Sequence, residues 1–193
     1  MLKVGITGGI GSGKSVVSDI IRLLGYPVYS SDERAKELSD TNAHIRKALV
    51  ALFGDDMYED NHLNRSLLAS SIFSDTSKIA EVNAIIHPVV FADFNQWCKE
   101  QTSRLVFAES AIIVESGFSV FMDTIILVDA PENLRIERVV KRDKTTVNAV
   151  RKRMKSQFPI AELRDHANYV IHNDNEQLLL PQVIMIIENL LSV

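Results

Sequence analysis

Residues 8–15 constrain this chain more than any other part of its sequence. They read Gly-Gly-Ile-Gly-Ser-Gly-Lys-Ser and match the phosphate-binding pattern G-x-x-x-x-G-K-[ST] at every position. The apolar run before them, residues 3–7, predicts a buried strand, and the apolar spacing over residues 15–24 predicts a helix. A glycine-rich loop between a strand and a helix is typical of proteins that bind a nucleoside triphosphate.

Each residue type in this loop has a physical role in holding a polyphosphate. Glycines allow positive φ, which turns backbone N–H groups toward phosphate oxygens, and the N-terminus of the next helix attracts the same anion. We expect Lys14 to reach the β- and γ-phosphates and the Ser15 hydroxyl to be a ligand of Mg²⁺. The alternative is a plain glycine-rich turn with a solvated lysine. The residues expected to contact the nucleotide are Gly9, Gly11, Ser12, Gly13, Lys14, Ser15 and Val16.

Length and composition favour a small protein of the cytoplasm. The chain has 193 residues, enough for one domain with inserted subdomains, and its net charge of −4 argues against a nucleic-acid partner. Its single cysteine, Cys98, excludes an intrachain disulfide and suits a reducing compartment. No apolar run reaches the ~20 residues of a membrane helix, and the early phosphate loop leaves no room for a signal peptide. Nothing in the sequence indicates an obligate protein partner.

Strands and helices alternate along most of the chain. Further short apolar runs predict strands at residues 27–31, 105–108, 124–128 and 169–171, and residues 111–114 form another apolar run. The alternation predicts an α/β fold with a parallel five-stranded sheet flanked by helices. Pro181 is tolerated only in the first turn of a helix, so we expect the last helix to begin late.

Two segments differ from simple connections between strands of the sheet: the first is too long, and the second is short and basic. Residues 33 to about 100 are mostly helical by pattern and predict a substrate-binding subdomain, in which Pro88 is expected to break or kink a helix or to start the next one. A short basic segment follows the fourth strand, with Thr145 and Thr146 as possible N-caps. We therefore expect one domain over residues 1–193. Its core covers about 1–35, 101–137 and 166–193, with a helical insertion of about 36–100 and a lid of about 138–165.

Asp32 is the carboxylate that we favour as a general base. It directly follows the second strand, and ligands of parallel sheets bind at the carboxyl ends of the strands. A carboxylate there can take the proton of an acceptor hydroxyl during phosphoryl transfer. Two alternatives stay open, in which Asp32 holds Mg²⁺ through water or caps the next helix.

Basic residues of the expected lid are candidates for charge neutralisation. Arg138 and Arg142 lie four residues apart on one helix face, where a closing lid could bring both onto phosphates. The alternative is a solvated face with Glu137 and Asp143 as ion-pair partners. A second basic run, residues 151–155, reads as a surface helix, with nucleic acid as an unsupported alternative.

Other polar residues carry weaker signals. Glu109 and Asp129 both end apolar runs as a carboxylate near Mg²⁺ would, and the pattern does not separate them. His87 precedes Pro88 in an apolar context, which is typical of a structural histidine. No paired Cys/His spacing predicts zinc, and no G-x-S-x-G elbow predicts a serine nucleophile.

Several separated segments resemble the dephospho-coenzyme A kinase family. Residues 5–15, G-I-T-G-G-I-G-S-G-K-S, are similar to the family's opening, and S-S-D at 30–32 stands where the family has D-A-D. The family's R-x-x-x-R-D is matched by R-V-V-K-R-D at 138–143. Further similar segments are L-N-R at 63–65 with Leu68 and Phe73, N-A-I-I-H-P at 83–88, A-I-I-V-E at 111–115, Arg153 with Gln157, and A-N-Y-V-I at 167–171 with Asn173.

The resemblance, which spans residues 5–175, implies a specific reaction. It implies a nucleotide core, a helical coenzyme A subdomain and a lid, with transfer of the ATP γ-phosphate to the 3′-hydroxyl of the dephospho-coenzyme A ribose. Such an enzyme is a phosphotransferase with an alcohol as acceptor, using ATP and Mg²⁺. By the same resemblance Asp32 matches the catalytic aspartate, Arg65 and His87 fall in the acceptor-binding subdomain, and Arg138 and Arg142 lie at the lid.

The sequence departs from the family at several positions. Ser30 replaces the first Asp of D-A-D, Ala111 replaces a usual Pro, Glu109 stands where Asp is common, and Asn168 stands for Asp. None of these changes affects Lys14, Ser15 or Asp32. A kinase acting on a nucleoside or nucleotide is the alternative, while a GTPase would need an N-K-x-D segment, which this sequence lacks.

Overall fold

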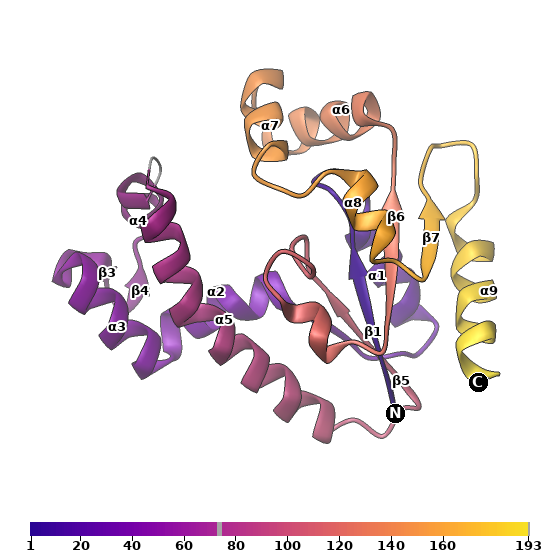
Figure 1. The fold of residues 1–193 in the computed structure, drawn as a ribbon, viewed down its shortest axis with the longest axis horizontal. Helices are drawn as coiled ribbons and strands as arrows, with labels where there is room; N and C mark the ends of the chain where they lie inside the picture. Colours follow the sequence, from indigo (N-terminus) through magenta and orange to yellow (C-terminus); the bar gives the residue numbers. More distant parts are fainter. Residues whose placement is uncertain (73–74, 193) are drawn as a thin grey trace. The chain divides into compact units, whose positions relative to one another are not determined.

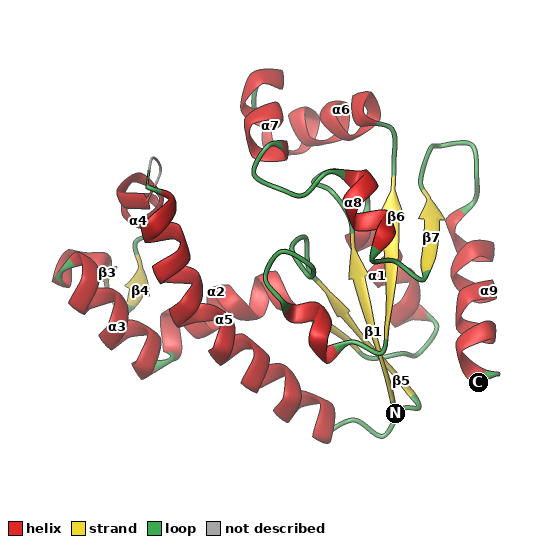
Figure 2. Cartoon of the chain, viewed as in Figure 1, coloured by secondary structure: helices red, strands yellow, loops and turns green. Residues whose placement is uncertain are grey.

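A five-stranded sheet carries the first and last parts of the chain. The strands of this computed structural model, which describes residues 1–72 and 75–192, run in the order β2-β5-β1-β6-β7 (Figures 1 and 2). All four neighbouring pairs are parallel, which confirms the predicted fold class. The strands are β1 (Leu2–Thr7), β2 (Val28–Ser30), β5 (Leu105–Glu109), β6 (Thr124–Asp129) and β7 (Tyr169–His172).

The strands are buried, as expected for a parallel sheet covered by helices. Val4, Ile6, Phe107 and Ile126 are at most 1% exposed and pack with apolar residues of α1 (Lys14–Leu23) and α9 (Leu179–Leu191). Pro181 lies in the first turn of α9, so the expected late start of this helix is confirmed. The remaining helices of this part are α6 (Glu132–Asp143), α7 (Val147–Met154), α8 (Ile160–Asp165) and the short η2 (Phe118–Phe121), while residues 111–117 form turns.

Residues 31–100 form a second, mainly helical unit with its own core. Its buried centre contains Ile45, Leu49, Met57 and Val82. Two arginine–aspartate bonds, from Arg34 Nε and Nη2 to Asp93 at 3.0 and 2.6 Å, join the first and last helices of the unit. Its elements are α2 (Ser31–Thr41), α3 (Ala43–Phe53), η1 (Asp55–Met57), β3 (Tyr58–Glu59), β4 (His62–Leu63), α4 (Arg65–Ile72) and α5 (Thr76–Lys99).

The structure contradicts a helix break or a new helix start at Pro88, two of the three outcomes expected there. Helix α5 runs through residues 76–99 with Pro88 inside it. A proline removes one backbone donor from a helix, at a cost of about 3 kcal/mol. Val82, Val90 and Phe94, on both sides of the proline, are at most 4% exposed, so burial of the α5 face offsets this cost.

The pattern of contacts divides the chain into two compact units. One contains Met1–Ser30 together with the chain from Gln101 onward, and the other contains Ser31–Glu100. The sequence placed the start of the insertion at about residue 36, whereas the second unit begins with α2 at Ser31. Phe73, which the resemblance included, lies outside the described residues. Among the described helices, none has the length and apolar character to cross a membrane.

Candidate active site

The phosphate loop is the connection between β1 and α1. β1 ends at Thr7 and α1 begins at Lys14, so residues 8–13 form the loop, as the sequence predicted. Gly11 and Gly13 have φ of +79° and +96°, a region that residues with a Cβ rarely adopt. The Ser12 N–H donates to the Gly9 carbonyl at 3.1 Å and closes a tight turn. These glycines therefore shape the loop backbone.

The loop is also packed closely by its neighbours. A Cβ added to Gly13 would collide with the Asn173 side-chain amide, and one added to Gly9 would collide with the Arg135 guanidinium. At Gly11 an added Cβ would lie 2.5 Å from the backbone oxygen of Arg135. Glycine is thus required both for backbone conformation and for close contact with α6 and with the residue after β7.

Lys14 is held over its own loop. Its side chain is buried, at 8% exposure, and its Nζ donates to the carbonyl oxygens of Gly8 and Gly9 at 2.8 and 3.5 Å. The plain-turn interpretation required a solvated lysine, and the structure contradicts it. The Ser12 Oγ is buried with no hydrogen-bond partner among the described residues, while Ser15 and Val16 are exposed at the start of α1.

Asn173 connects the loop to α6. Its Nδ2 donates to the Ser12 carbonyl at 2.7 Å, and its Oδ1 accepts from Arg138 Nη2 at 3.2 Å. Arg138 Nη2 also donates to the Asn173 carbonyl at 3.2 Å and to Asn175 Oδ1 at 2.7 Å. Arg138 Nη1 is buried without a hydrogen-bond partner in the described part of the chain. The structure therefore brings Arg138 to the residues that support the phosphate loop.

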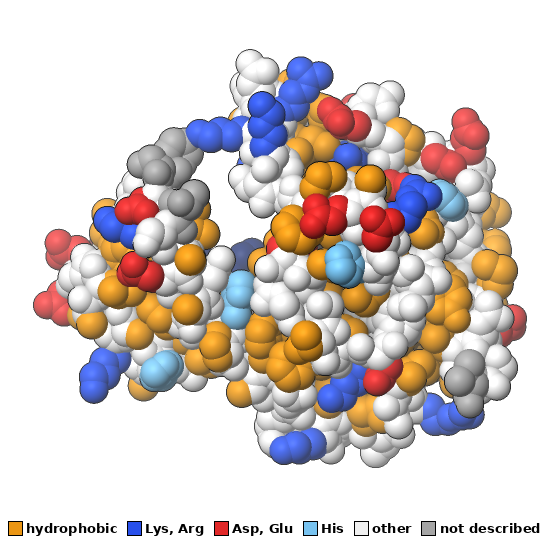
Figure 3. Space-filling model, viewed as in Figure 1, with side chains coloured by type: hydrophobic (Ala, Val, Ile, Leu, Met, Phe, Trp, Pro, Cys, Tyr) orange, Lys and Arg blue, Asp and Glu red, His pale blue; other side chains and the backbone are white. Residues whose placement is uncertain are grey.

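Arg142 lies in a different environment from Arg138. Its guanidinium, in a side chain 62% exposed, bonds the neighbouring Asp143 at 2.7 and 3.3 Å, and Arg153 Nη1 bonds the same carboxylate at 2.7 Å. The hydrogen bonds from Arg142 and Arg153 lower the pKa of Asp143 to about 2. Lys and Arg side chains gather around α6 and α7 (Figure 3), whose last turns carry Lys141, Arg142, Arg151, Lys152 and Arg153. The ion-pair partner named in the alternative interpretation, Asp143, is thus present.

Arg135 is a buried cation beside the loop that no sequence motif indicated. It lies on α6, is 8% exposed, and its Nε donates to the Ala130 carbonyl at 3.1 Å. Burial lowers the pKa of Arg135, although Glu132 and Asp129 act in the opposite direction; an arginine remains charged in either case. The sequence did contain one indication that Arg135 is buried. It precedes the apolar Val139 by four residues and therefore lies on the same buried helix face.

Helices α6 and α7 pack on the tip of the loop. Ile10 packs against a cluster of Ile136, Val139 and Val150 from α6 and α7. The Ile10 N–H also donates to Gln157 Oε1 at 2.8 Å. In the sequence, only the family resemblance drew attention to Gln157. No local pattern could predict its contact with Ile10, because the two residues are 147 positions apart.

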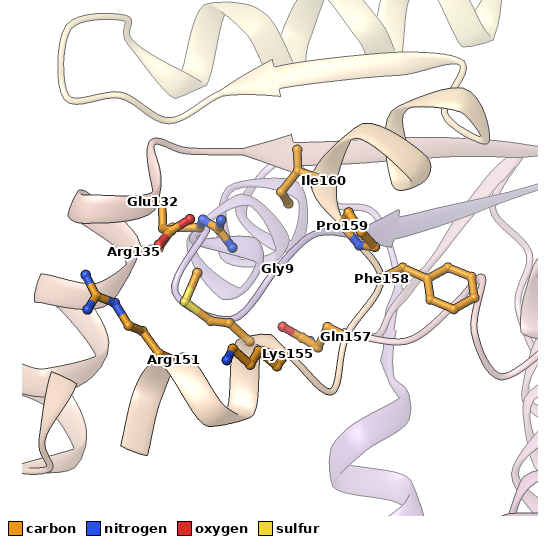
Figure 4. A pocket seen from close by; sticks show the side chains of 10 residues that line it. Gly9, Glu132, Arg135, Arg151, Lys155, Gln157, Phe158, Pro159 and Ile160 are labelled. Atoms are coloured by element: carbon orange, nitrogen blue, oxygen red, sulfur yellow. The ribbon is translucent and has the colours of Figure 1, made fainter. Parts of the chain in front are cut away.

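A cavity opens between the loop, α6, α7 and residues 155–160. Its volume is about 570 Å³. Figure 4 shows its side chains, including Arg135, Lys155 and Gln157. Phe158 is one of the residues that line the cavity, and its N–H donates to Glu115, in the turn before η2, at 3.0 Å.

The two strand-end carboxylates that the sequence left unresolved have different surroundings. Asp129 accepts a hydrogen bond from Arg164 Nη2 at 2.6 Å, so an arginine already neutralises its charge. Glu109 ends β5, the strand next to β1, and is paired in register with Ile6, two residues before the loop. Within the described residues, no group of three His, Cys, Asp or Glu side chains is arranged to hold a metal.

The helical unit contains the remaining predicted site residues. Asp32 is exposed in the first turn of α2, two residues after the end of β2, so it lies inside the helix rather than at its N-cap. A carboxylate in a first turn is stabilised by the partial positive charge of that helix end.

Arg65 and His87 belong to the same helical unit as Asp32. Arg65 Nη2 donates to Asp40 Oδ2 at 3.0 Å and to the Lys36 carbonyl at 2.9 Å. Burial raises the pKa of Asp40, but hydrogen bonds from the Leu63 N–H, Arg65 and His62 outweigh it, so this pKa lies below its usual value. His87 lies on α5 beside Phe91, with ring centroids 5.9 Å apart, and burial lowers its pKa.

A phosphate loop after the first strand of a five-stranded parallel sheet, with a helix that begins at the loop's lysine, defines a P-loop protein of the class that binds nucleoside triphosphates. A dephospho-CoA kinase family model matches residues 2–178. The dephospho-CoA kinase of Porphyromonas gingivalis is 49% identical over 189 residues, covering 97% of this chain and 94% of the relative. The chain therefore belongs to the dephospho-CoA kinase family.

Solved structures agree with the fold. The crystal structure of TT1252 from Thermus thermophilus is similar with a TM-score of 0.85 and 30% identity, covering 99% of this chain and 96% of that one. The dephospho-CoA kinase from Campylobacter jejuni has a TM-score of 0.71 at 23% identity, covering 97% and 96% of the two chains, and supports the fold.

Proposed function

We propose that this protein transfers the γ-phosphate of ATP to the 3′-hydroxyl of the ribose of dephospho-coenzyme A, giving coenzyme A and ADP. This is the last step of coenzyme A biosynthesis. The observation that carries the proposal is a complete phosphate loop with its buried lysine in place, in a chain that belongs to the dephospho-CoA kinase family.

The loop residues fit a polyphosphate. Gly11 and Gly13 have the positive φ of an anion-binding loop, and the buried Ser12 Oγ lacks a partner among the described residues. In the proposed complex, Lys14 exchanges its bonds to the Gly8 and Gly9 carbonyls for bonds to the β- and γ-phosphates.

We propose Mg²⁺ as the metal of the reaction, with Ser15 as its protein ligand. Mg²⁺ takes few ligands from proteins and several from phosphates and water, which suits one exposed hydroxyl at the start of α1. When bound, the ion neutralises charge on the phosphates. Of the two strand-end carboxylates we favour Glu109 on the metal side, because it ends the strand beside β1 in register with Ile6, two residues before the loop.

The acceptor side of the proposal depends on residues of the helical unit. Asp32 acts as general base toward the 3′-hydroxyl, while Arg65 and His87 bind the acceptor. Arg138 and Arg142 neutralise charge on the transferred phosphoryl group, which requires that Arg142 leave its surface pair with Asp143.

The proposal includes a cytoplasmic location and action on small molecules without nucleic acid, a membrane or an obligate protein partner. Its support is the net charge of −4 and the single cysteine, Cys98, which is buried.

An acceptor-dependence assay tests the proposed function. ADP release is measured with ATP and Mg²⁺ in the presence of dephospho-coenzyme A, adenosine, AMP or no acceptor. We expect release only with dephospho-coenzyme A, in stoichiometric amounts. Release with adenosine or AMP would instead support the alternative of a nucleoside or nucleotide kinase. Release without any acceptor would indicate an ATPase and would contradict both assignments.

A further inference from the structure

Arg135 is a buried cation whose hydrogen-bonding capacity is largely unused. Its side chain is 8% exposed, yet the only hydrogen bond it donates within the described residues runs from Nε to the Ala130 carbonyl. No carboxylate of the described chain forms an ion pair with it; Glu132 and Asp129 act on it only at longer range. Burying a guanidinium without pairing it is costly, so its terminal nitrogens call for an anionic partner.

The position of Arg135 indicates where that partner binds. Arg135 Nη1 lies against Gly9, so close that a Cβ at Gly9 would collide with it. Lys14 Nζ lies 3.5 Å from the carbonyl oxygen of the same glycine. A P-loop lysine reaches the β- and γ-phosphates, so Arg135 and Lys14 converge on the part of the loop that faces the terminal phosphate.

The cavity beside Gly9 has the charge that suits an anion. Arg135, Arg151 and Lys155 line it, together with one carboxylate, Glu132. Figure 4 shows Arg135 on one side of the cavity, and Lys155 and Gln157 on the opposite side. All of these residues belong to the unit that contains the phosphate loop.

We propose that Arg135 binds the terminal phosphoryl group of the nucleoside triphosphate and stabilises it during transfer. This inference rests on the proposed function, since it assigns a further residue to the same nucleotide site. A planar guanidinium offers two parallel donors to phosphoryl oxygens, and it is already placed and desolvated before the reaction. The guanidinium therefore stabilises the charge that develops on the transferred phosphoryl group without first having to change its position.

Comparison of triphosphate with diphosphate binding tests this proposal. Calorimetric titrations with ADP and with the non-hydrolysable ATP analogue adenylyl imidodiphosphate, both with Mg²⁺, are made on the native protein and on Arg135→Gln. We expect Arg135→Gln to weaken binding of the ATP analogue by about 10- to 100-fold while ADP binding stays within about 3-fold, because only the triphosphate has the terminal group. The turnover rate falls by at least a similar factor.

A matched variant controls for loss of positive charge. Lys141→Gln removes a cation from an exposed position of the same helix, and it is expected to leave both affinities and turnover unchanged. An equal loss of ADP and ATP-analogue binding in Arg135→Gln would overturn the proposal, because Arg135 would then only support the Gly9 backbone. Unchanged binding of both nucleotides would overturn it as well.

A second variant keeps the proposal testable if Arg135→Gln does not fold. Arg135→Lys keeps the charge and the apolar stem but loses the forked donors. We expect it to lower the affinity for the ATP analogue relative to ADP by several-fold, and an unchanged ratio would contradict the proposal. These titrations need no acceptor, so they remain interpretable if dephospho-coenzyme A is not the substrate.

Discussion

At the scale of single residues, Asp32 has the sharpest predicted role. Asp32→Asn removes the proton-accepting carboxylate and keeps a side chain of the same size at an exposed position in the first turn of α2. We expect turnover with dephospho-coenzyme A to fall by about 10²- to 10⁴-fold while ATP affinity is kept. Steady-state kinetics and ATP titration measure the two effects. Glu33→Gln, in the same helical turn, is the matched control, and near-normal turnover of Asp32→Asn would exclude the general-base role.

Asn173 shows how one side chain supports the phosphate loop from a distance. Asn173→Ala removes the bond to the Ser12 carbonyl at 2.7 Å and one acceptor of Arg138. We expect the free energy of unfolding to fall by about 1–3 kcal/mol, because a part-buried carbonyl loses its donor, and KM for ATP to rise. Denaturant unfolding and kinetics give both values. Asn175→Gly, which removes an exposed Arg138 contact and suits the φ of +72° at this position, is expected to change neither by much.

At the scale of elements, α7 depends on a single N-cap. The sequence offered Thr145 and Thr146, and the structure selects Thr146, whose hydroxyl accepts the Ala149 N–H at 3.3 Å. Thr146→Ala should destabilise α7 by about 0.5–2 kcal/mol, seen as faster amide hydrogen exchange over residues 147–154. Thr145→Ala is the control, and an equal effect of the two substitutions would show that the cap does not stabilise the helix.

The elements also differ in how far local sequence determines them. The start of α9 was predicted correctly from Pro181, because proline fits the first turn of a helix. Pro88 did not end α5, because the buried side chains Val82, Val90 and Phe94 hold the helix in place on both sides. Local propensity therefore decides an element only where packing against the rest of the unit does not oppose it.

At the scale of the whole molecule, His87 makes stability depend on pH. Its pKa in the folded chain lies below the ordinary value of 6.5, because burial disfavours the imidazolium ion. The unfolded chain therefore binds more protons, and the free energy of unfolding falls as the pH decreases through and below 6.5. Urea unfolding over this pH range measures the slope. His87→Gln should make the slope shallower, and an identical slope would show that His87 does not cause it.

The sequence by itself determined the phosphate loop, the α/β class and the family. These features are contiguous or periodic, so they can be recognised in the order of the residues: the loop needs only residues 8–15 and their flanking strand and helix. Lys14 and the glycines were predicted because each residue type has a local physical role. Asp32 and Arg142 were named on the same grounds, whereas Arg65 and His87 were named through the family resemblance, and the roles of all four remain predictions.

Only the tertiary structure decided which distant residues meet at the loop. Asn173 reaches Ser12 across 161 positions, and Gln157 reaches Ile10 across 147, because parallel strands bring separate segments to one edge of the sheet. Arg135 reads in the sequence as one more basic residue of a helix. Folding buries it against Gly9, and burial without an anionic partner among the described residues is what turns an ordinary arginine into a candidate for binding phosphate.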